Sequence, residues 1–206
     1  MGPALLSFDV FGTLIDTPAG TAAAFQSILV DAGAGHIDPG PFWNHWEERN
    51  IAHYREPYQS YKEICRISLE ETFLHFRIPG GDGRLIQRYF EAFPRFALYP
   101  DVAPTLEALA PRHRLAVVSN IDDDLLAATR LGREFDLVCT AIDRAGVGLE
   151  EILHSGQSQF TDMVGGKPLG LTIAWINRRG LSLHPSVPRP DFIFPGLAPL
   201  GSLLLA

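Results

Sequence analysis

The 206-residue sequence contains only two cysteines, Cys65 and Cys139, and only two lysines, Lys62 and Lys167. Two cysteines in apolar segments cannot form a disulfide framework, which favours core thiols in a reducing, cytoplasmic setting. No apolar run approaches the roughly 20 residues that a membrane span needs. Residues 1–8 lack the basic flank of a signal peptide, so we expect them to form a strand.

Basic residues are scarce as well. Seventeen Lys and Arg stand against 24 Asp and Glu, which gives a formal charge of −7 at pH 7. This balance argues against a nucleic acid as the main partner. No segment is polar and repetitive enough to indicate disorder. We therefore expect a globular cytoplasmic protein that binds neither nucleic acid nor membrane.

Short apolar segments recur along the chain, and stretches compatible with helices separate several of them. Strands that alternate with helices predict a parallel sheet with helices on both faces. Helices are expected over residues 122–131, over 160–169 and after Gly196. The predicted strands cover residues 4–9, 114–120, 135–140, 152–155, 171–176 and 192–194.

Residues 18–97 contain no such strands and show helical periodicity instead. Proline and glycine breaks divide this region into about four helices. Most of the aromatic residues lie here, where we expect them to pack a small bundle. The sequence thus predicts an α/β protein with a doubly wound, Rossmann-like core (residues 1–17 and 98–206) and an inserted helical cap (residues 18–97).

Polar residues follow three of the predicted strands, where ligands bind in an open parallel sheet. They lie in Phe8-Asp-Val-Phe-Gly-Thr-Leu-Ile-Asp16, in Val118-Ser-Asn-Ile-Asp122 and in the segment 157–162. These motifs, in this order and ahead of Trp175-Ile-Asn-Arg-Arg179, resemble the haloacid dehalogenase (HAD) superfamily. The resemblance is greatest to its 2-haloacid dehalogenase branch and covers nearly the whole chain.

The resemblance implies that Asp9 is a nucleophile. A carboxylate at a strand end can attack an electrophilic carbon and form an ester, which water then hydrolyses. Gly12 permits the sharp turn after Asp9, and Thr13 can hold that carboxylate or an anionic substrate. Asp16 lies past the turn, so we expect it to cap a helix.

The residue two positions after Asp9 bears on the substrate class. Phosphatases of the superfamily have a second aspartate there as a general acid, whereas this chain has Phe11. A halide leaving group needs no proton donor, so Phe11 fits carbon–halogen cleavage. Packing is the alternative role for Phe11. We expect neither a metal ion nor another cofactor.

The remaining site residues follow from the resemblance. Ser119 would bind the substrate carboxylate, and Asn120 would help to receive the halide. Asp162 would position or activate the hydrolytic water, with capping of the following helix as its alternative role. Arg49 is the first candidate for the cap arginine that assists the halide in the family, and Arg55 is the second. Both are also compatible with ordinary surface positions.

We expect mainly structural roles for three further groups of residues. Asp122-Asp-Asp124 is expected to begin a helix rather than to bind a metal ion. The turn at Asn177–Gly180 is expected to be structural. No two of the seven histidines have metal-ligand spacing, and His154, at the end of a strand, is a weaker candidate for the site.

One family motif is missing. The resemblance implies a lysine that pairs with the nucleophile, but no lysine lies between Asn120 and Asp162. The span 142–151 has only ten residues, fewer than a crossover helix needs. Arg144 and Lys167 are weak substitutes. A natural deletion, a mis-spliced reading frame and a divergent member of the family are open explanations.

The sequence therefore predicts a hydrolase that cleaves the carbon–halide bond of a short 2-haloacid, with activity weakened by the missing lysine. Two alternatives stay open. One is a catalytically silent relative that binds a partner through its aromatic cap, and the other is hydrolysis of another small electrophile by the same route. Phosphatase activity ranks last because of Phe11. The resemblance is also compatible with a homodimer formed through the cap.

Overall fold

The computed structural model describes residues 2–54, 56–57, 59–138 and 147–206, and its chain divides into two compact units. No helix among these described residues is long and apolar enough to cross a membrane. The sheet unit comprises Met1–Asp16, Leu98–Ser119 and Leu131–Ala206, and the helical unit comprises Thr17–Ala97 and Asn120–Arg130.

Six parallel strands form the sheet, in the order β3-β2-β1-β4-β5-β6. β1 lies between β2 and β4, and all four of its residues are buried. The predicted parallel sheet is confirmed, and each predicted strand overlaps an observed one. The strands are β1 (Leu5–Phe8), β2 (Arg114–Val117), β3 (Leu137–Val138), β4 (Ile152–Gly156), β5 (Thr172–Ile176) and β6 (Phe192–Phe194).

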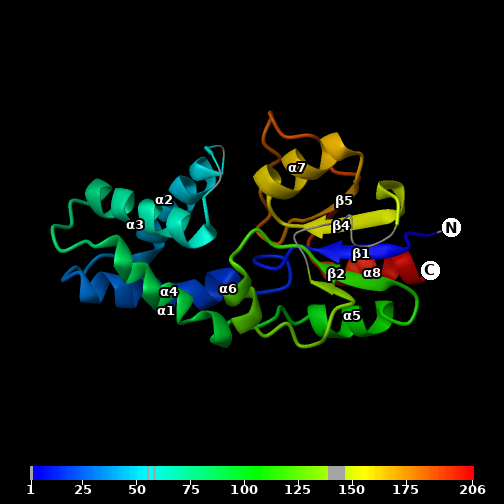
Figure 1. Cartoon of the computed structure of the whole chain (residues 1–206), viewed down its shortest axis with the longest axis horizontal. Helices are drawn as coiled ribbons and strands as arrows, with labels where there is room; N and C mark the ends of the chain where they lie inside the picture. The colour runs from blue at the N-terminus through cyan, green and yellow to red at the C-terminus, as the bar shows by residue number, and fades with distance from the viewer. Residues whose placement is uncertain (1, 55, 58, 139–146) are drawn as a thin grey trace. The chain divides into compact units, whose positions relative to one another are not determined.

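Helices cover both faces of this sheet (Figure 1). On one face lies the predicted 160–169 helix, which is a π-helical turn η5 (Gln159–Met163) followed by α7 (Val164–Gly166) and η6 (Lys167–Leu169). On the other face α5 (Val102–Leu109) packs against α8 (Leu197–Leu205). The confirmed arrangement is a doubly wound α/β core.

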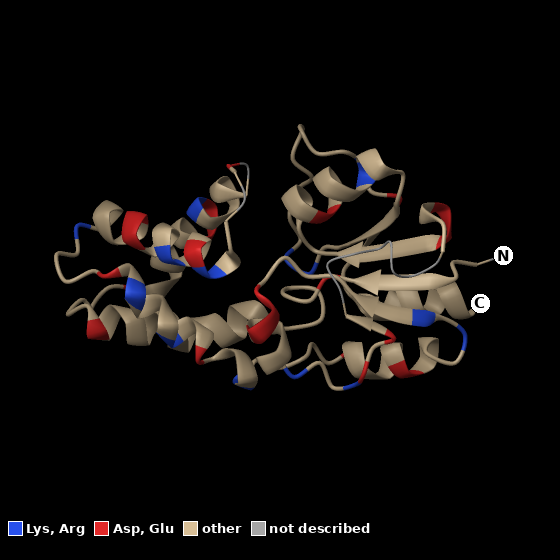
Figure 2. Ribbon diagram, viewed as in Figure 1, with Lys and Arg blue, Asp and Glu red and all other residues tan. Residues whose placement is uncertain are grey.

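The core beneath η5 and α7 explains why these segments dock on the sheet. Leu5, Ile152 and Trp175 project from three neighbouring strands and pack with Met163, which is fully buried. Burying side chains of this size stabilises the fold by about 1.5 to 3 kcal/mol each. Strands β1, β4 and β5 carry no Lys, Arg, Asp or Glu along their length (Figure 2).

Helix α5 was not predicted from the sequence. Pro104 lies in its first turn, where a missing N–H breaks no intrahelical hydrogen bond. Asp101, just before α5, accepts the backbone N–H of Leu197 at 2.6 Å and thereby joins α5 to the start of α8.

The chain leaves and re-enters the sheet unit at adjacent points. Ile15 and Leu98 form an antiparallel bridge, and the N–H of Tyr99 donates to the carbonyl of Leu14 at 2.9 Å. Thr17–Ala97 belong to the helical unit, so this part of the helical unit is an insertion after β1.

The helical unit is held together by aromatic side chains, as the sequence predicted. The ring of Phe25 is fully buried and lies 5.0 Å from Trp46, 5.8 Å from Tyr89 and 6.3 Å from Phe42, in edge-on contacts. Its elements are α1 (Thr17–Asp31), α2 (Pro39–His53), α3 (Tyr61–His75), η1 (Gly83–Ile86), α4 (Gln87–Phe90), η2 (Phe93–Arg95) and α6 (Asp123–Ala128).

Residues 120–130 pack with the helical unit, whereas the sequence had placed them in the core range 98–206. Helix α6 begins where predicted, but the Asp122 carboxylate does not cap it. Instead Asp122 accepts the backbone N–H of Lys62, in the first turn of α3, at 2.8 Å. Asp124 pairs with the Lys62 ammonium at 2.5 Å. The acidic run therefore binds the start of another helix, a contact across 60 residues that no local pattern reveals.

Candidate functional site

Asp9 is the first residue after β1, in the middle of the sheet. Its backbone N–H donates to the carbonyl of Ser155 on β4 at 2.8 Å, so the position of its Cα is fixed by the sheet. Its side chain lies at the carboxyl end of the strands, where the sequence placed it, and the residue is only 9% exposed.

The turn after Asp9 folds back on the carboxylate. The Thr13 hydroxyl donates to Oδ2 of Asp9 at 2.8 Å, and both groups are buried. Gly12 has a φ of +81°, which a residue with a side chain adopts only with strain. The geometry agrees with the turn predicted at Gly12 and with a Thr13 hydroxyl that holds the Asp9 carboxylate, whereas a contact of Thr13 with a substrate anion stays a prediction.

Arg178 supports the same turn, although the sequence indicated only a structural turn there. Its Nε donates to the carbonyl of Thr13 at 3.0 Å, and its guanidinium lies 3.9 Å from the ring centroid of Tyr99. Its Nη1 pairs with Asp101 at 2.9 Å. Burial alone would raise the pKa of Asp101, but the Arg178 hydrogen bond and the Leu197 N–H outweigh burial and hold it below its ordinary value.

Asp162 lies in η5, which follows β4. Its Oδ2 accepts the backbone N–H of Ser158 at 2.8 Å, and its carboxylate lies directly on Gly156, where a Cβ atom would collide with Oδ2. Glycine at 156 therefore lets Asp162 approach the end of the sheet. The capping alternative describes part of its role, because the Ser158 bond closes the turn that begins η5.

Asp9 and Asp162 act on each other electrostatically. Burial, and then the negative charge of Asp162, raise the pKa of Asp9 well above its ordinary value, while the Thr13 hydrogen bond opposes both. None of the described Lys, Arg or His side chains forms an ion pair with Asp9. Lys167, one weak substitute for the missing lysine, instead pairs with Asp191 at 2.7 Å. Arg144, the other, lies outside the described residues.

His154 connects the Asp162 carboxylate to strand β1. Its Nδ1 shares a hydrogen bond of 2.9 Å with the Ser7 hydroxyl, and its Nε2 lies 3.5 Å from Oδ1 of Asp162. His154 was only a weak candidate for the site in the sequence analysis. The pairing of Ser7 with His154 in the β1–β4 register, which is a property of the sheet, places it there.

Ser119 follows β2, next to β1, where Val118 donates its N–H to the carbonyl of Phe8 at 2.9 Å. The Ser119 hydroxyl is buried and makes no hydrogen bond within the described part of the chain. The Ser155 hydroxyl is also buried and makes no hydrogen bond within the described part of the chain, although the sequence did not indicate a role for it.

The two glutamines before Asp162 have different surroundings. The side chain of Gln157 lies against Gly12, 2.8 Å from where a Cβ atom there would stand, so it covers the Asp9 turn. Gln159 instead binds the backbone of residues 182 and 184, at 2.9 and 2.7 Å. Only Gln157 therefore lies on the turn that carries the nucleophile candidate.

Phe11 is half-buried and bridges to Ile15 within the turn. Asn120 is the first residue of the stretch that packs with the helical unit. Arg49 lies in the helical unit, where Nε pairs with Glu71 at 2.6 Å, and it lines a pocket of about 400 Å³ beside His53. Arg55 lies outside the described residues.

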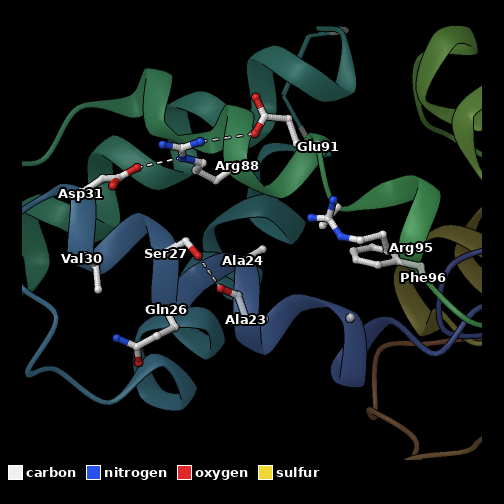
Figure 3. A pocket seen from close by; sticks show the side chains of 12 residues that line it. Ala23, Ala24, Gln26, Ser27, Val30, Asp31, Arg88, Glu91, Arg95 and Phe96 are labelled. Atoms are coloured by element: carbon white, nitrogen blue, oxygen red, sulfur yellow. Dashed lines mark hydrogen bonds and ion pairs between the residues drawn. The ribbon is translucent and has the colours of Figure 1, made fainter.

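A second pocket of the helical unit, of about 570 Å³, lies between α1 and the segment from α4 to η2 (Figure 3). At this pocket Arg88 forms ion pairs with Asp31 and Glu91, at 2.8 and 3.5 Å. None of the described residues that line it is a predicted site residue.

No protein-family model matches the sequence, and no curated protein matches it. Solved structures do resemble it. An L-2-haloacid dehalogenase from Xanthobacter autotrophicus matches with a TM-score of 0.77 and 22% identity over 98% of each chain. The L-2-haloacid dehalogenase RSc1362 matches with a TM-score of 0.81 and 21% identity over 100% of each chain. The HAD-hydrolase YfnB from Bacillus subtilis, bound to magnesium, matches with a TM-score of 0.81 and 18% identity over 100% of each chain.

These matches extend over both the sheet unit and the inserted helical unit, since they cover the whole chain or nearly so. At such identities the likeness establishes the fold. The chain therefore has the fold of the haloacid dehalogenase superfamily, as its three motifs predicted.

Proposed function

We propose that this chain is a hydrolase of the haloacid dehalogenase type with Asp9 as its nucleophile. The observation that carries the proposal is the pair of carboxylates, Asp9 and Asp162, that the ends of β1 and β4 bring together. Because the two carboxylates lie close together, the negative charge of Asp162 helps to raise the pKa of Asp9. Two carboxylates in different surroundings can divide the roles of nucleophile and base.

The reaction has two displacements. An oxygen of Asp9 attacks the α-carbon of the substrate, a C–O bond forms, and the carbon–halogen bond breaks with its electron pair on the halide. Water then attacks Cγ of Asp9, the ester bond to the product breaks, and a hydroxy acid leaves. Thr13 orients the Asp9 carboxylate for the first step, and Asp162 receives a proton from water in the second.

A short 2-haloacid is the substrate class that we propose. Ser119 has a buried hydroxyl that makes no hydrogen bond within the described part of the chain and can therefore bind a carboxylate. Phe11 stands where the superfamily's phosphatases have the aspartate that protonates the leaving group of a phosphate ester. Roles for Asn120 and Arg49 with the halide stay predictions from the resemblance, as do a cytoplasmic location and a homodimer.

The donor set does not fit a magnesium site of the kind that the superfamily's phosphatases use. Magnesium prefers several oxygen ligands, and Phe11 stands where the second carboxylate would be. The described residues contain no group of three or more His, Cys, Asp or Glu that could hold a metal ion. In the proposed reaction Asp9 and Asp162 therefore act without a metal ion.

Chloride release from both enantiomers of 2-chloropropionate tests the proposal. The native chain is expected to release chloride from one enantiomer, and Asp9→Asn is expected to release none. Asp16→Asn is the matched control, because it removes a carboxylate just past the same turn. Equal traces of chloride from the native chain and Asp9→Asn would refute the proposal.

A single turnover in H₂¹⁸O tests the route. Because water attacks Cγ of Asp9, one ¹⁸O atom should enter the peptide that contains Asp9, as mass spectrometry would show. Label in the hydroxy acid alone would mean direct attack by water and would rule out the ester.

A catalytically silent relative is the second candidate. It is favoured by the raised pKa of Asp9, because a protonated carboxyl is a poor nucleophile, and by the missing lysine. Failure of the native chain to form any ester at Asp9, even at alkaline pH, would support it.

A further inference from the structure

Among the described residues, His154 is the basic side chain that contacts the Asp162 carboxylate. It lies on β4 opposite Ser7 of β1, on the same side of the sheet as Asp9, because side chains two residues apart share a face. It is 6% exposed, and its contacts to Ser7 and Asp162 lie at opposite ends of the ring. Contacts therefore run from Ser7 on β1 through His154 on β4 to Asp162 in η5.

The chemistry of the two partners decides which ring nitrogen carries hydrogen. An ionised carboxylate can only accept, so the Asp162 carboxylate, 3.5 Å from Nε2, favours the tautomer with hydrogen on Nε2. The Ser7 hydroxyl can donate to Nδ1 when the ring is neutral and can accept from Nδ1 when the ring is charged. Ser7 can thus satisfy His154 in either charge state.

The described strands and η5 around His154 bring no other cation. Strands β1 and β5 contain no ionisable side chain, and η5 contributes only Asp162. Asp9, just beyond β1, is the other charged group at this end of the sheet. The ionisable groups here are therefore two carboxylates and one imidazole. This count covers the described strands β1, β4 and β5, the segment η5 and the first residue after β1.

We propose that His154 is a positioning residue that orients Asp162 and balances its charge while Asp162 serves as the base for hydrolysis of the Asp9 ester. This inference rests on the proposed function. As water attacks Cγ of Asp9, its proton passes to Asp162, and the ester C–O bond breaks. The proton then goes to the alkoxide of the departing hydroxy acid. The remaining proton of the new Asp9 carboxyl leaves to solvent, so the site returns to its initial state.

Two substitutions distinguish the contact of His154 with Asp162 from its contact with Ser7. His154→Gln puts a neutral N–H donor near the position of Nε2, whereas His154→Asn keeps a polar group near Nδ1 and loses the reach to Asp162. If the Asp162 contact matters, ester hydrolysis falls about tenfold or more in the Asn variant and less in the Gln variant. Halide release in the first turnover stays close to native in both, so the ester accumulates and intact-mass spectrometry detects it.

His184→Asn is the matched control. His184 also has a ring nitrogen bonded to a serine, Ser186, at 2.8 Å, but it is exposed and makes no described contact with Asp162. Its hydrolysis rate should equal the native rate. The inference would be overturned if the hydrolysis rate fell equally in the Gln and Asn variants without ester accumulation. It would also be overturned if the rate fell less in the Asn variant than in the Gln variant. Either result would indicate a purely structural bond to Ser7.

A spectroscopic test keeps this inference separate from the proposed function. The ¹⁵N shifts of the His154 ring in the native chain should show hydrogen on Nε2, and Asp162→Ala should remove that preference while the shifts of His184 stay unchanged. An unchanged ratio of tautomers in Asp162→Ala would overturn the coupling even in a chain without activity. A chain that shows the coupling but forms no ester would contradict the proposed function alone.

Discussion

Asp9→Asn should stabilise the protein at neutral pH. Burial, and then the charge of Asp162, place the pKa of Asp9 in the folded chain above its value in the unfolded chain. The folded state therefore resists ionisation, and each tenfold change in the ionisation constant costs about 1.4 kcal/mol. The cost begins as the pH rises past the unfolded pKa, about 3.9, and is complete once the pH exceeds the folded pKa.

The substitution removes the charge and leaves the packing nearly intact. Asparagine has the size of aspartate and keeps an oxygen that can accept the Thr13 hydroxyl, which lies 2.8 Å from Oδ2 of Asp9. Single stabilising substitutions commonly contribute about 0.5 to 2 kcal/mol. In a chain of this length that corresponds to a rise of about 1 to 8 °C in Tm.

Urea unfolding at several pH values measures the effect. The gain from Asp9→Asn should be present at pH 7 to 8 and should vanish below about pH 3, where Asp9 is protonated in both states. Asp101→Asn is a control of opposite sign, because Arg178 and the Leu197 N–H hold the pKa of Asp101 below its ordinary value despite burial. It should cost about 1 to 3 kcal/mol at neutral pH. That loss should fade on acidification.

The reasoning would be refuted by a loss of stability in Asp9→Asn at pH 8. Such a result would mean that the ionised Asp9 carboxylate is stabilised in the folded chain, and hence that a cation outside the described residues compensates it. A gain independent of pH would point to packing rather than to charge.

Three further substitutions have definite expected effects. Gly156→Ala should push the Asp162 carboxylate away from the end of β4 and so slow ester hydrolysis more than ester formation, as accumulation of the ester would show. Arg178→Met removes the pair with Asp101 and the bond to the Thr13 carbonyl, and should lower the free energy of unfolding by about 3 kcal/mol. Phe25→Ala opens a cavity in the aromatic core of the helical unit and should cost about 3 to 5 kcal/mol, measured by denaturant unfolding.

The sheet could be predicted from the sequence because its strands are short apolar runs with polar ends. The segments around Asp9 and Ser119 show this pattern clearly, and their order along the chain is that of a doubly wound fold. Helix α5 was missed because Pro100 and Pro104 give its first turn the pattern of a loop. The short crossover was predicted over residues 142–151, and residues 142–146 of that span lie outside the described residues.

The candidate site could be predicted only in part, because much of it depends on contacts distant in sequence. Thr13 lies four residues from Asp9, so a local pattern shows their relation. His154 reaches Ser7 across 147 residues, and Arg178 reaches Thr13 across 165. Strand register determines the first contact and the packing of the 177–180 turn determines the second, and neither leaves a signal in a single sequence.

The missing lysine and the raised pKa of Asp9 together set the pH range in which this site can act. Lys62 and Lys167 are paired with Asp124 and Asp191, so neither ammonium is free to serve Asp9. Burial and the charge of Asp162 raise the pKa of Asp9, so Asp9 becomes nucleophilic only as the pH rises. The rate of ester formation should therefore increase with pH, and a rate independent of pH from the acidic range upward would show that a cation outside the described residues serves the site.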